Sequence, residues 1–220
     1  RNTHRKRIVV LWRWARKQGY LPRNVQTEAE LTERAKEPTP ERGIITPKAY
    51  RDLLIIIKEK HPHYLPAIAL AGFCGLRPDE VHHQMWEDVK LDQKLLKVSH
   101  AKAGTPAYRH VPICEAAIEW MILSPKKRVG RICSNQAIDR IRKIGKNAGL
   151  ELPANCFRHS FVSYRVVQSG NIDRTSQEAG NSPRVVHRHY RELVTKEEAD
   201  EWFSIQPKEE VVGEVVSYEY

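Results

Sequence analysis

Two arginines in this sequence stand where a folded protein seldom places them for stability alone. Arg77 follows an apolar stretch and lies in Gly75-Leu-Arg-Pro-Asp-Glu80, a sharp turn into a new helix. Arg158 opens a helix whose other residues are core-like, so its guanidinium starts near buried surface. Two such groups repel each other unless an anion lies between them, and a phosphate can accept two hydrogen bonds from each. The alternative is that each arginine pairs with a carboxylate, such as Asp79 or Glu80, as ordinary structure.

Two further side chains suit proton transfer and nucleophilic attack. Lys102 lies beside Gly104 at the tip of a predicted hairpin, where its ammonium group can donate a proton or contact a DNA backbone. Tyr190 ends a predicted helix within a basic stretch, residues 187–191. Neighbouring cations favour the phenolate, which is the nucleophilic form of tyrosine. Taken singly, an exposed turn lysine and a partly buried aromatic are the commoner interpretations.

The histidines and cysteines do not form the pattern of a metal site. His187 and His189 are two positions apart on a predicted helix, and His82 and His83 are adjacent, so neither pair shares a helix face. The cysteines indicate small buried apolar residues in a reducing compartment, and we expect no metal, no cofactor and no disulfide framework. They are scattered singly along the chain, at Cys74, Cys114, Cys133 and Cys156.

The composition favours a polyanionic partner for a folded body. Lys plus Arg is 37 and Asp plus Glu is 27 in 220 residues, so the net charge is 37 − 27 = +10. This excess points to nucleic acid first and an anionic membrane surface second. A hydrophobic content of 40% is too high for a disordered basic tail. The longest apolar stretch, residues 64–76, is shorter than the ~20 residues of a membrane span, which excludes a membrane-spanning protein.

The elements that must position these residues are mainly helical. Thr46-Pro47 predicts a helix start, and helices are expected at 115–123, 136–148, 156–168, 173–179 and 183–190. We expect Asn135 to cap the second of these helices, and the Thr195–Glu198 capping box to open a last one. Three short strands are predicted where the hydrophobic period changes, at 86–89, 95–98 and 108–113. The predicted fold class is mainly α with a small three-stranded antiparallel sheet, an α+β domain.

A basic helix precedes this domain. Before residue 20 there are seven Lys and Arg residues and no acid, while Ile8, Leu11, Trp12 and Ala15 recur at helical spacing. Its basic side chains are the predicted DNA contacts, namely Arg5, Lys6, Arg7, Arg13 and Lys17. A Pro-containing segment, 38–45, predicts a linker before the main domain at 46–205, and residues 206–220 form an acidic tail.

Taken in order, Arg77, Lys102, Arg158 and Tyr190 resemble the catalytic residues of the tyrosine recombinases, the phage integrase family. The resemblance covers roughly residues 44–205 and includes Phe157-Arg158-His159-Ser160-Phe161 and Ala179-Gly180-Asn181-Ser182. Each motif alone is weak, whereas all of them in order are specific. Residues 1–37 then resemble the end of the helical DNA-clamping (core-binding) domain that precedes the catalytic domain in this family.

The resemblance implies a reaction and a partner. Tyr190 would attack a DNA phosphodiester to form a 3′-phosphotyrosyl link, with Arg77 and Arg158 on the phosphate oxygens and Lys102 protonating the leaving 5′-hydroxyl. Glu80 would orient Arg77, and neither metal nor ATP would be needed. The partners would be double-stranded DNA and further copies of the chain, as a tetramer on two duplexes in the cytosol and nucleoid of a bacterium, with no membrane.

The sequence departs from the family at two positions. Asn155 stands three residues before Arg158, where the family usually has His or Lys, and Asn181 follows Gly180, where it usually has His or Trp. An amide can donate a hydrogen bond to a phosphate oxygen, but it cannot accept and release a proton near neutral pH. General acid–base help is worth ~10²–10⁴-fold, so we expect a weakened active site.

Three functions are therefore open. The first is a site-specific DNA recombinase of a mobile element with weakened activity. The second is a catalytically inactive DNA-binding protein on the same fold, which Asn155 and Asn181 favour. The third is a basic scaffold for protein or RNA in which the four residues match by accident.

Overall fold

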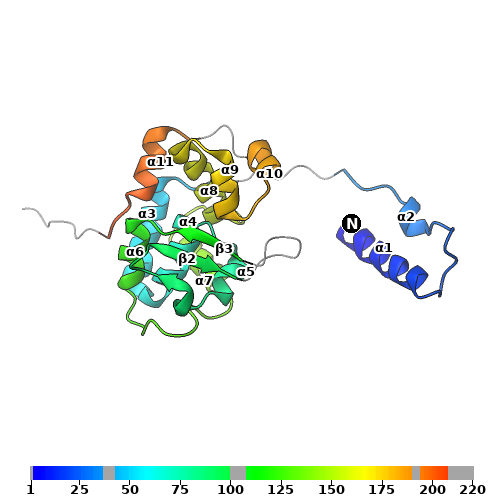
Figure 1. Ribbon diagram of the computed structural model, residues 1–220, viewed down its shortest axis with the longest axis horizontal. Coiled ribbons are helices and arrows are strands. Elements are labelled where there is room, and N and C mark those ends of the chain that lie inside the picture. The colour runs from blue at the N-terminus through cyan, green and yellow to red at the C-terminus, as the bar shows by residue number, and fades with distance from the viewer. Residues whose placement is uncertain (1, 37–42, 100–107, 190–193, 208–220) are drawn as a thin grey trace, which may run out of the picture. The chain divides into compact units, whose positions relative to one another are not determined.

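The structure is a computed structural model that describes residues 2–36, 43–99, 108–189 and 194–207. The chain divides into two compact units, residues 1–41 and 42–220, and each is described by itself. Figure 1 shows the elements, of which η1 and η2 are short 3-10 helices. In chain order they are α1 (Asn2–Lys17), α2 (Glu28–Leu31), α3 (Pro47–Lys60), η1 (Pro62–Tyr64), α4 (Leu65–Phe73), α5 (Pro78–His83), η2 (Trp86–Asp88), β1 (Val89–Lys90), β2 (Leu95–Val98), β3 (Arg109–Pro112), α6 (Glu115–Ile122), α7 (Ala137–Asn147), α8 (Cys156–Ser169), α9 (Ile172–Ala179), α10 (Pro183–His189) and α11 (Lys196–Phe203).

The first unit is the predicted basic helix α1 with the one-turn helix α2 beside it. Glu30 of α2 holds the pair together, because it accepts hydrogen bonds from both Nη atoms of Arg16, at 2.6 and 3.4 Å. On α1 only Val9 and Ala15 are buried, whereas Ile8 and Leu11 are exposed. The apolar positions recognised from the sequence spacing are therefore mostly at the surface of this unit.

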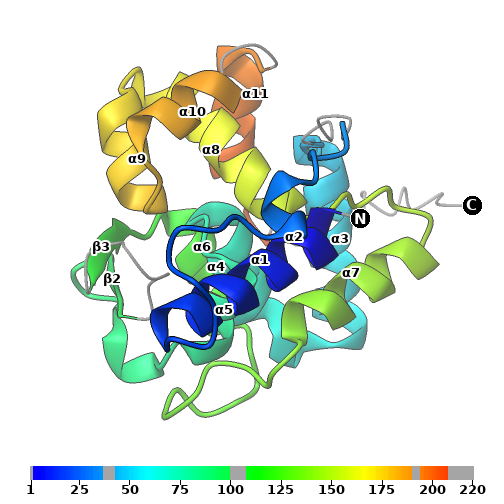
Figure 2. The same ribbon diagram turned by 90° about the vertical axis from the view of Figure 1, so that its right-hand side faces the viewer.

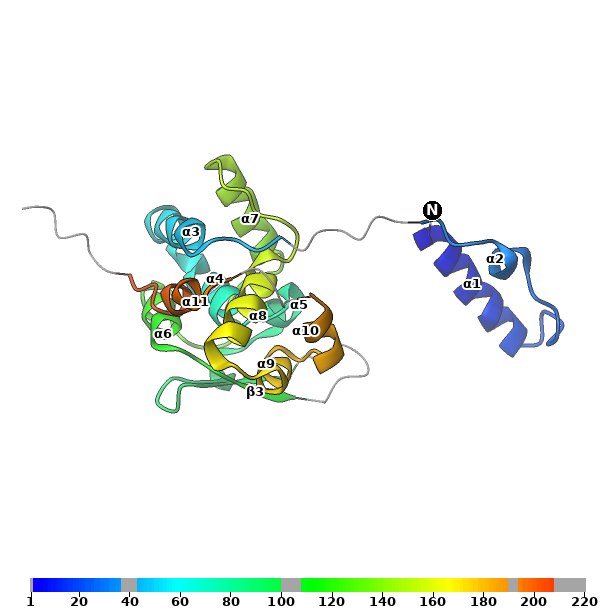
Figure 3. The same cartoon turned by 90° about the horizontal axis from the view of Figure 1, so that it is seen from above.

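The second unit is built around α4. Every residue of α4 is buried, so no polar face limits what packs against it. Helices α3, α6, α7 and α8 all contact α4, and Figure 3 shows α4 among them. A helix that is apolar on all sides can only lie in a core, so the sequence of α4 determines its place at the centre.

The sheet follows the order β1-β2-β3 and is antiparallel throughout. Leu96 pairs with Val89 on one side and with Val111 on the other, and all three side chains are buried. Helix α9 lies beside β3, as both Figure 1 and Figure 2 show. The sheet thus has one apolar face on the core and an edge strand, β3, that meets the C-terminal helices.

Helix α11 closes the core from the C-terminal side. Thr195 accepts a hydrogen bond from the Glu198 backbone and Glu198 accepts one from the Thr195 backbone, which confirms the predicted capping box. Trp202 is fully buried, stacks on Tyr50 with ring centroids 4.3 Å apart, and donates its indole N–H to the carbonyl of Gly72 at 3.1 Å. Helix α11 therefore packs into the core of the second unit.

The predicted fold class is confirmed, and two local predictions are wrong. Residues 86–88, predicted as part of a strand, form η2, because only Val89 and Lys90 pair with β2. Asn135 does not cap α7: the N-cap is Gln136, in the left-handed region at φ +66°, and the Asn135 side chain accepts a hydrogen bond from Arg131 instead. The nearby arginine competes for the side-chain oxygen that a cap needs.

Candidate functional site

A tight turn delivers Arg77 to the start of α5. Gly75 has φ +65°, and a Cβ there would lie 2.1 Å from the ring of Phe161, so only glycine fits between α4 and α8. Arg77 is the N-cap of α5, Pro78 occupies the first turn, and Glu80 completes a capping box by accepting from the Arg77 backbone N–H at 2.8 Å. The capping contacts within the Gly-Leu-Arg-Pro-Asp-Glu motif thus fix the backbone of Arg77 at the start of α5.

Glu80 is the centre of the charge network and is only 2% exposed. It accepts from Nη1 of Arg77 at 2.7 Å and, in a fork, from Nη1 and Nη2 of Arg109 at 2.9 and 2.8 Å. Burial by itself raises the pKa of Glu80, but the hydrogen bonds and charge of Arg109, with the Arg77 backbone bond, more than offset it and leave the pKa below its ordinary value. Glu80 is therefore ionised and shared by two arginines.

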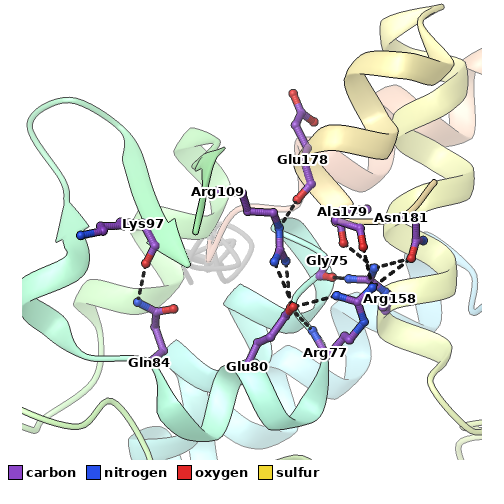
Figure 4. Close-up of polar contacts among 11 residues, drawn as sticks. Gly75, Arg77, Glu80, Gln84, Lys97, Arg109, Arg158, Glu178, Ala179 and Asn181 are labelled. Carbon is purple, nitrogen blue, oxygen red and sulfur yellow. Dashed lines mark hydrogen bonds and ion pairs between the residues drawn. The ribbon is translucent and has the colours of Figure 1, made fainter. Parts of the chain in front are cut away.

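Arg158 comes from the first turn of α8 and is 7% exposed. Its Nη1 donates to the carbonyl of Gly75 at 2.5 Å, and its Nη2 donates to the carbonyl of Ala179 and to Oδ1 of Asn181, the latter at 2.9 Å. These contacts join the turn before α5, the helix α8 and the end of α9 at one guanidinium. Figure 4 shows the arginines converging from their separate elements.

The end of α9 supplies the acceptors that face the two arginines. Gly180 caps α9 in the left-handed conformation at φ +62°, and beyond this turn the carbonyls of Ala179 and Gly180 and the side chain of Asn181 all accept hydrogen bonds from Arg77 or Arg158. Nη2 of Arg77 donates to the Gly180 carbonyl at 2.6 Å and to Asn181 Oδ1 at 3.0 Å.

One oxygen atom, Oδ1 of Asn181, therefore accepts hydrogen bonds from both Arg77 and Arg158. Two guanidinium groups held at about the same distance from a single oxygen form a grip that fits a phosphate oxygen as well as an amide oxygen. The predicted meeting of Arg77 and Arg158 is thus found in the structure. The alternative pairing holds for Arg77, which does pair with Glu80.

Asn155 lies at the other predicted departure, one turn before Arg158. It is exposed, adopts the left-handed conformation at φ +56°, and precedes the first residue of α8. With Arg158, Leu76 and Phe157 it lines a cavity of about 70 Å³ between α5, α7 and α8. Asn155 is therefore at the edge of the site, whereas Asn181 is at its centre.

Two of the predicted catalytic residues, Lys102 and Tyr190, lie outside the described residues. Of the predicted DNA contacts on α1, Lys6, Arg7, Arg13 and Lys17 are exposed. Arg5 has a structural task, because its Nε and Nη2 donate to the carbonyls of Thr32 and Glu30 at 2.5 and 3.0 Å.

Sequence reasoning missed Arg109, the first residue of β3. The alternation of the strand places it on the same face as Val111, which is fully buried. An arginine in register with buried residues needs a carboxylate partner, and that signal was available in the sequence. The partner itself was not, because Glu80 is 29 residues away.

A second buried carboxylate fastens α9 to α8. The two carboxylate oxygens of Glu178 each accept a hydrogen bond from Arg165, at 2.8 and 2.9 Å. One of them, Oε1, also accepts a hydrogen bond from Arg174 at 3.0 Å. Burial raises the pKa of Glu178, and the hydrogen bond and charge of Arg165 outweigh it, so the net shift is downward. Arg165 thus fastens the side chain of Glu178 to α8, while Arg109 binds the backbone carbonyl of the same residue.

Cysteines and clustered metal ligands are the other residue types that could form a site. The four cysteines are free, and burial raises the pKa of each thiol. No cluster of three or more His, Cys, Asp or Glu residues with metal-binding geometry occurs among the described residues. Nor does any described helix combine the length and apolar character that crossing a membrane requires.

No protein-family model and no curated protein matches the sequence. Solved structures do match the fold. XerA recombinase superposes with a TM-score of 0.56 at 18% identity, over 78% of this chain and 65% of that chain. A lambda integrase (75-356) dimer bound to a COC′ core site gives a TM-score of 0.65 at 17% identity, over 88% and 75% of the two chains. The catalytic domain of bacteriophage HP1 integrase gives 0.54 at 20% identity, over 68% and 87%.

These matches show that the chain has the fold of tyrosine recombinase catalytic domains, which confirms the resemblance at the level of the fold. The chain spans slightly less than two thirds of the XerA structure.

Proposed function

We propose that this protein is a site-specific DNA recombinase that cuts and rejoins DNA through a tyrosine–phosphate link. One observation carries the proposal: the guanidinium groups of Arg77 and Arg158 converge on a single oxygen, Asn181 Oδ1, at 3.0 and 2.9 Å. Both arginines are fixed by carbonyls or by Glu80, so the grip is preorganised, and preorganised donors are what stabilise a charged transition state.

In this proposal a non-bridging oxygen of the scissile phosphate takes the place of Asn181 Oδ1. The phenol oxygen of Tyr190 forms a bond to phosphorus and the bond from phosphorus to the 5′-oxygen breaks. The phenol releases its proton to water, and the 5′-oxygen gains a proton, which Lys102 donates. The phosphate remains a diester, so a second 5′-hydroxyl can attack the 3′-phosphotyrosyl link and reverse the step without ATP.

Asn181 then has two tasks in sequence. Its oxygen separates the two guanidinium groups in the structure described here, and its side chain must rotate when the phosphate enters. After rotation its Nδ2 can donate a hydrogen bond to the phosphate, but it cannot accept the phenol proton. We therefore expect cleavage to be slow, by ~10²–10⁴-fold relative to a site with a titratable group there.

The basic helix α1 contributes to DNA binding in the same proposal. Lys6, Arg7, Arg13 and Lys17 are exposed on it, and such residues supply the salt-dependent part of the affinity by displacing counterions from the phosphate backbone. Double-stranded DNA is the proposed partner, and a homo-oligomer, a tetramer on two duplexes, is the proposed assembly.

The test is to trap the covalent intermediate. The chain is incubated with nicked duplexes taken from the ends of the genetic element that encodes it, and denaturing gels are searched for a protein–DNA band. We expect a band with the native sequence and none with Tyr190→Phe, because the phenylalanine lacks the attacking oxygen. A band that persists in Tyr190→Phe would overturn the assignment of the nucleophile.

A catalytically inactive DNA-binding protein is the second candidate, and Asn155 and Asn181 favour it. The same experiment separates the two. A probe that the protein binds with strong salt dependence but never links covalently, even when Asn155 and Asn181 are both replaced by His, would support the DNA-binding function alone.

A further inference from the structure

Arg109 connects three elements around the proposed site, β3, α5 and α9. It begins β3, its side chain is 12% exposed, and all three of its nitrogen positions donate hydrogen bonds. Nη1 and Nη2 bind Glu80 of α5, and Nε donates to the carbonyl of Glu178 in α9 at 2.8 Å. Figure 4 shows the guanidinium between these two helices.

The contact with α9 is close. A Cβ on Gly180 would lie 3.1 Å from Nη1 and 3.2 Å from Nε and Cζ of Arg109, so the guanidinium packs directly against the backbone that caps α9. The next residue is Asn181, whose oxygen both Arg77 and Arg158 bind. The position of Arg109 therefore limits where the end of α9 can lie.

On α5, the carboxylate of Glu80 is shared between Arg109 and Arg77. Oε1 of Glu80 accepts from Nη1 of Arg109 at 2.9 Å and from Nη1 of Arg77 at 2.7 Å. An arginine fork is planar, so two parallel bonds fix the plane of the Glu80 carboxylate. That plane in turn fixes the direction in which Arg77 receives its bond. Without the fork, Glu80 can turn both oxygens toward Arg77 and pull its guanidinium away from Asn181.

We infer that Arg109 is a positioning residue: it sets the separation and direction of the Arg77 and Arg158 guanidinium groups by bracing Glu80 against the end of α9. It does not itself touch the phosphate. The inference rests on the proposed function, because a fixed separation matters only if one phosphate is held by both arginines. A misplacement of about 1 Å at a reacting centre can lower a rate ~10²-fold.

A matched control separates this role from simple stability. Arg165 also makes a forked ion pair with a buried carboxylate, at 2.8 and 2.9 Å to Glu178, and it is similarly covered at 18% exposure. It fastens α9 to α8 through the side chain of Glu178. Arg165→Met therefore removes the same charge and a fork to a buried carboxylate, while it takes no atom from the bonds that join Arg109 to Glu80 and to the Glu178 carbonyl.

The experiment measures two quantities for Arg109→Met, Arg109→Lys and Arg165→Met in the full chain. These are the rate constant for covalent complex formation on a nicked duplex and the dissociation constant for that duplex. We expect Arg109→Met to lower the rate constant ~10²-fold with affinity changed less than about threefold, and Arg165→Met to change neither by more than about threefold. Arg109→Lys should restore the rate only in part, since lysine cannot form the fork.

The double variant Glu80→Gln with Arg109→Met tests whether Arg109 acts through Glu80. Its rate should equal that of the slower single variant, because both changes break the same brace. Rates that multiply, or a larger loss with Arg165→Met than with Arg109→Met, would overturn the inference.

A second readout needs no turnover. The side-chain Nε–H signals of Arg77 and Arg158 in a ¹⁵N-labelled chain, assigned with Arg77→Lys and Arg158→Lys, report where those groups lie. We expect both signals to shift or broaden in Arg109→Met and to stay in Arg165→Met. Unchanged signals in folded Arg109→Met would overturn the inference. The absence of any covalent product from the native chain would instead overturn the proposed function and leave this readout to decide on Arg109.

Discussion

Replacing Glu80 by Gln should destabilise the fold by about 3–4 kcal/mol. Glu80 accepts four hydrogen bonds, from the backbone and Nη1 of Arg77 and from both Nη atoms of Arg109. A glutamine has one oxygen, which can accept about two of them, and its NH₂ group then faces guanidinium donors. Two lost charge-assisted bonds at about 1.5–2 kcal/mol each give about 3–4 kcal/mol, which agrees with ~3–5 kcal/mol for breaking a buried ion pair.

Urea unfolding at pH 7 measures this loss, with Glu201→Gln as the control. Glu201 pairs with Arg51 at 2.9 Å, but both side chains are about 40% exposed. A surface pair contributes about 0–1 kcal/mol, so the control should unfold at nearly the native urea concentration. A free-energy difference below about 1 kcal/mol for Glu80→Gln would refute the view that Glu80 carries the network.

The difference in stability between the native protein and Glu80→Gln should also depend on pH. The pKa of Glu80 is lowered from about 4.5 in the folded state, so its ionised form stabilises the fold above that pH. This stabilisation is lost as the pH falls below about 4.5 and through the folded-state pKa. The difference between native protein and Glu80→Gln should therefore be full at pH 7 and shrink below pH 4.5, and a difference that stays constant into acid would contradict the assignment.

Three further changes test other parts of the structure. Asn181→Asp places a carboxylate between two guanidinium groups, so it should raise the unfolding free energy by about 1–2 kcal/mol and weaken binding to a nicked duplex. Asn155→Asp, at the edge of the site, is the control, and its unfolding free energy and its affinity for the duplex should change less. Gly75→Ala should prevent normal folding, seen by circular dichroism, because its Cβ would lie 2.1 Å from Phe161 at φ +65°. Trp202→Ala should lower the unfolding free energy by about 3–5 kcal/mol in urea titrations, and a loss under 1 kcal/mol would mean that α11 is not part of the core.

Much of the fold follows from local sequence. Thr46 and Thr195 have the side chains and the spacing that helix starts require, and both accept the capping bonds expected of them. Helix α4 has no polar face and therefore had to be central. The strands β2 and β3 form where the hydrophobic period changes to two. These predictions succeed because each depends on residues within one or two turns of each other.

The site was predicted in part for a different reason. Arg77 and Arg158 were recognised as residues too costly to leave near a core without a partner, and that argument needs only their local surroundings. Their motifs, together with Lys102 and Tyr190, indicated the fold, which the solved structures confirm. The motifs did not indicate which hydrogen-bond acceptors the two arginines would meet.

The sequence by itself therefore determined the helices, the sheet and the two arginines, because caps, periodicity and burial are properties of neighbouring residues. Only the tertiary structure decided that Asn181 Oδ1 lies between Arg77 and Arg158 and that Arg109 shares Glu80 with Arg77. These three bonds join residues that are 23, 29 and 104 positions apart in the chain. Their partners are chosen by how α5, α8, α9 and β3 pack, and no local pattern encodes that choice.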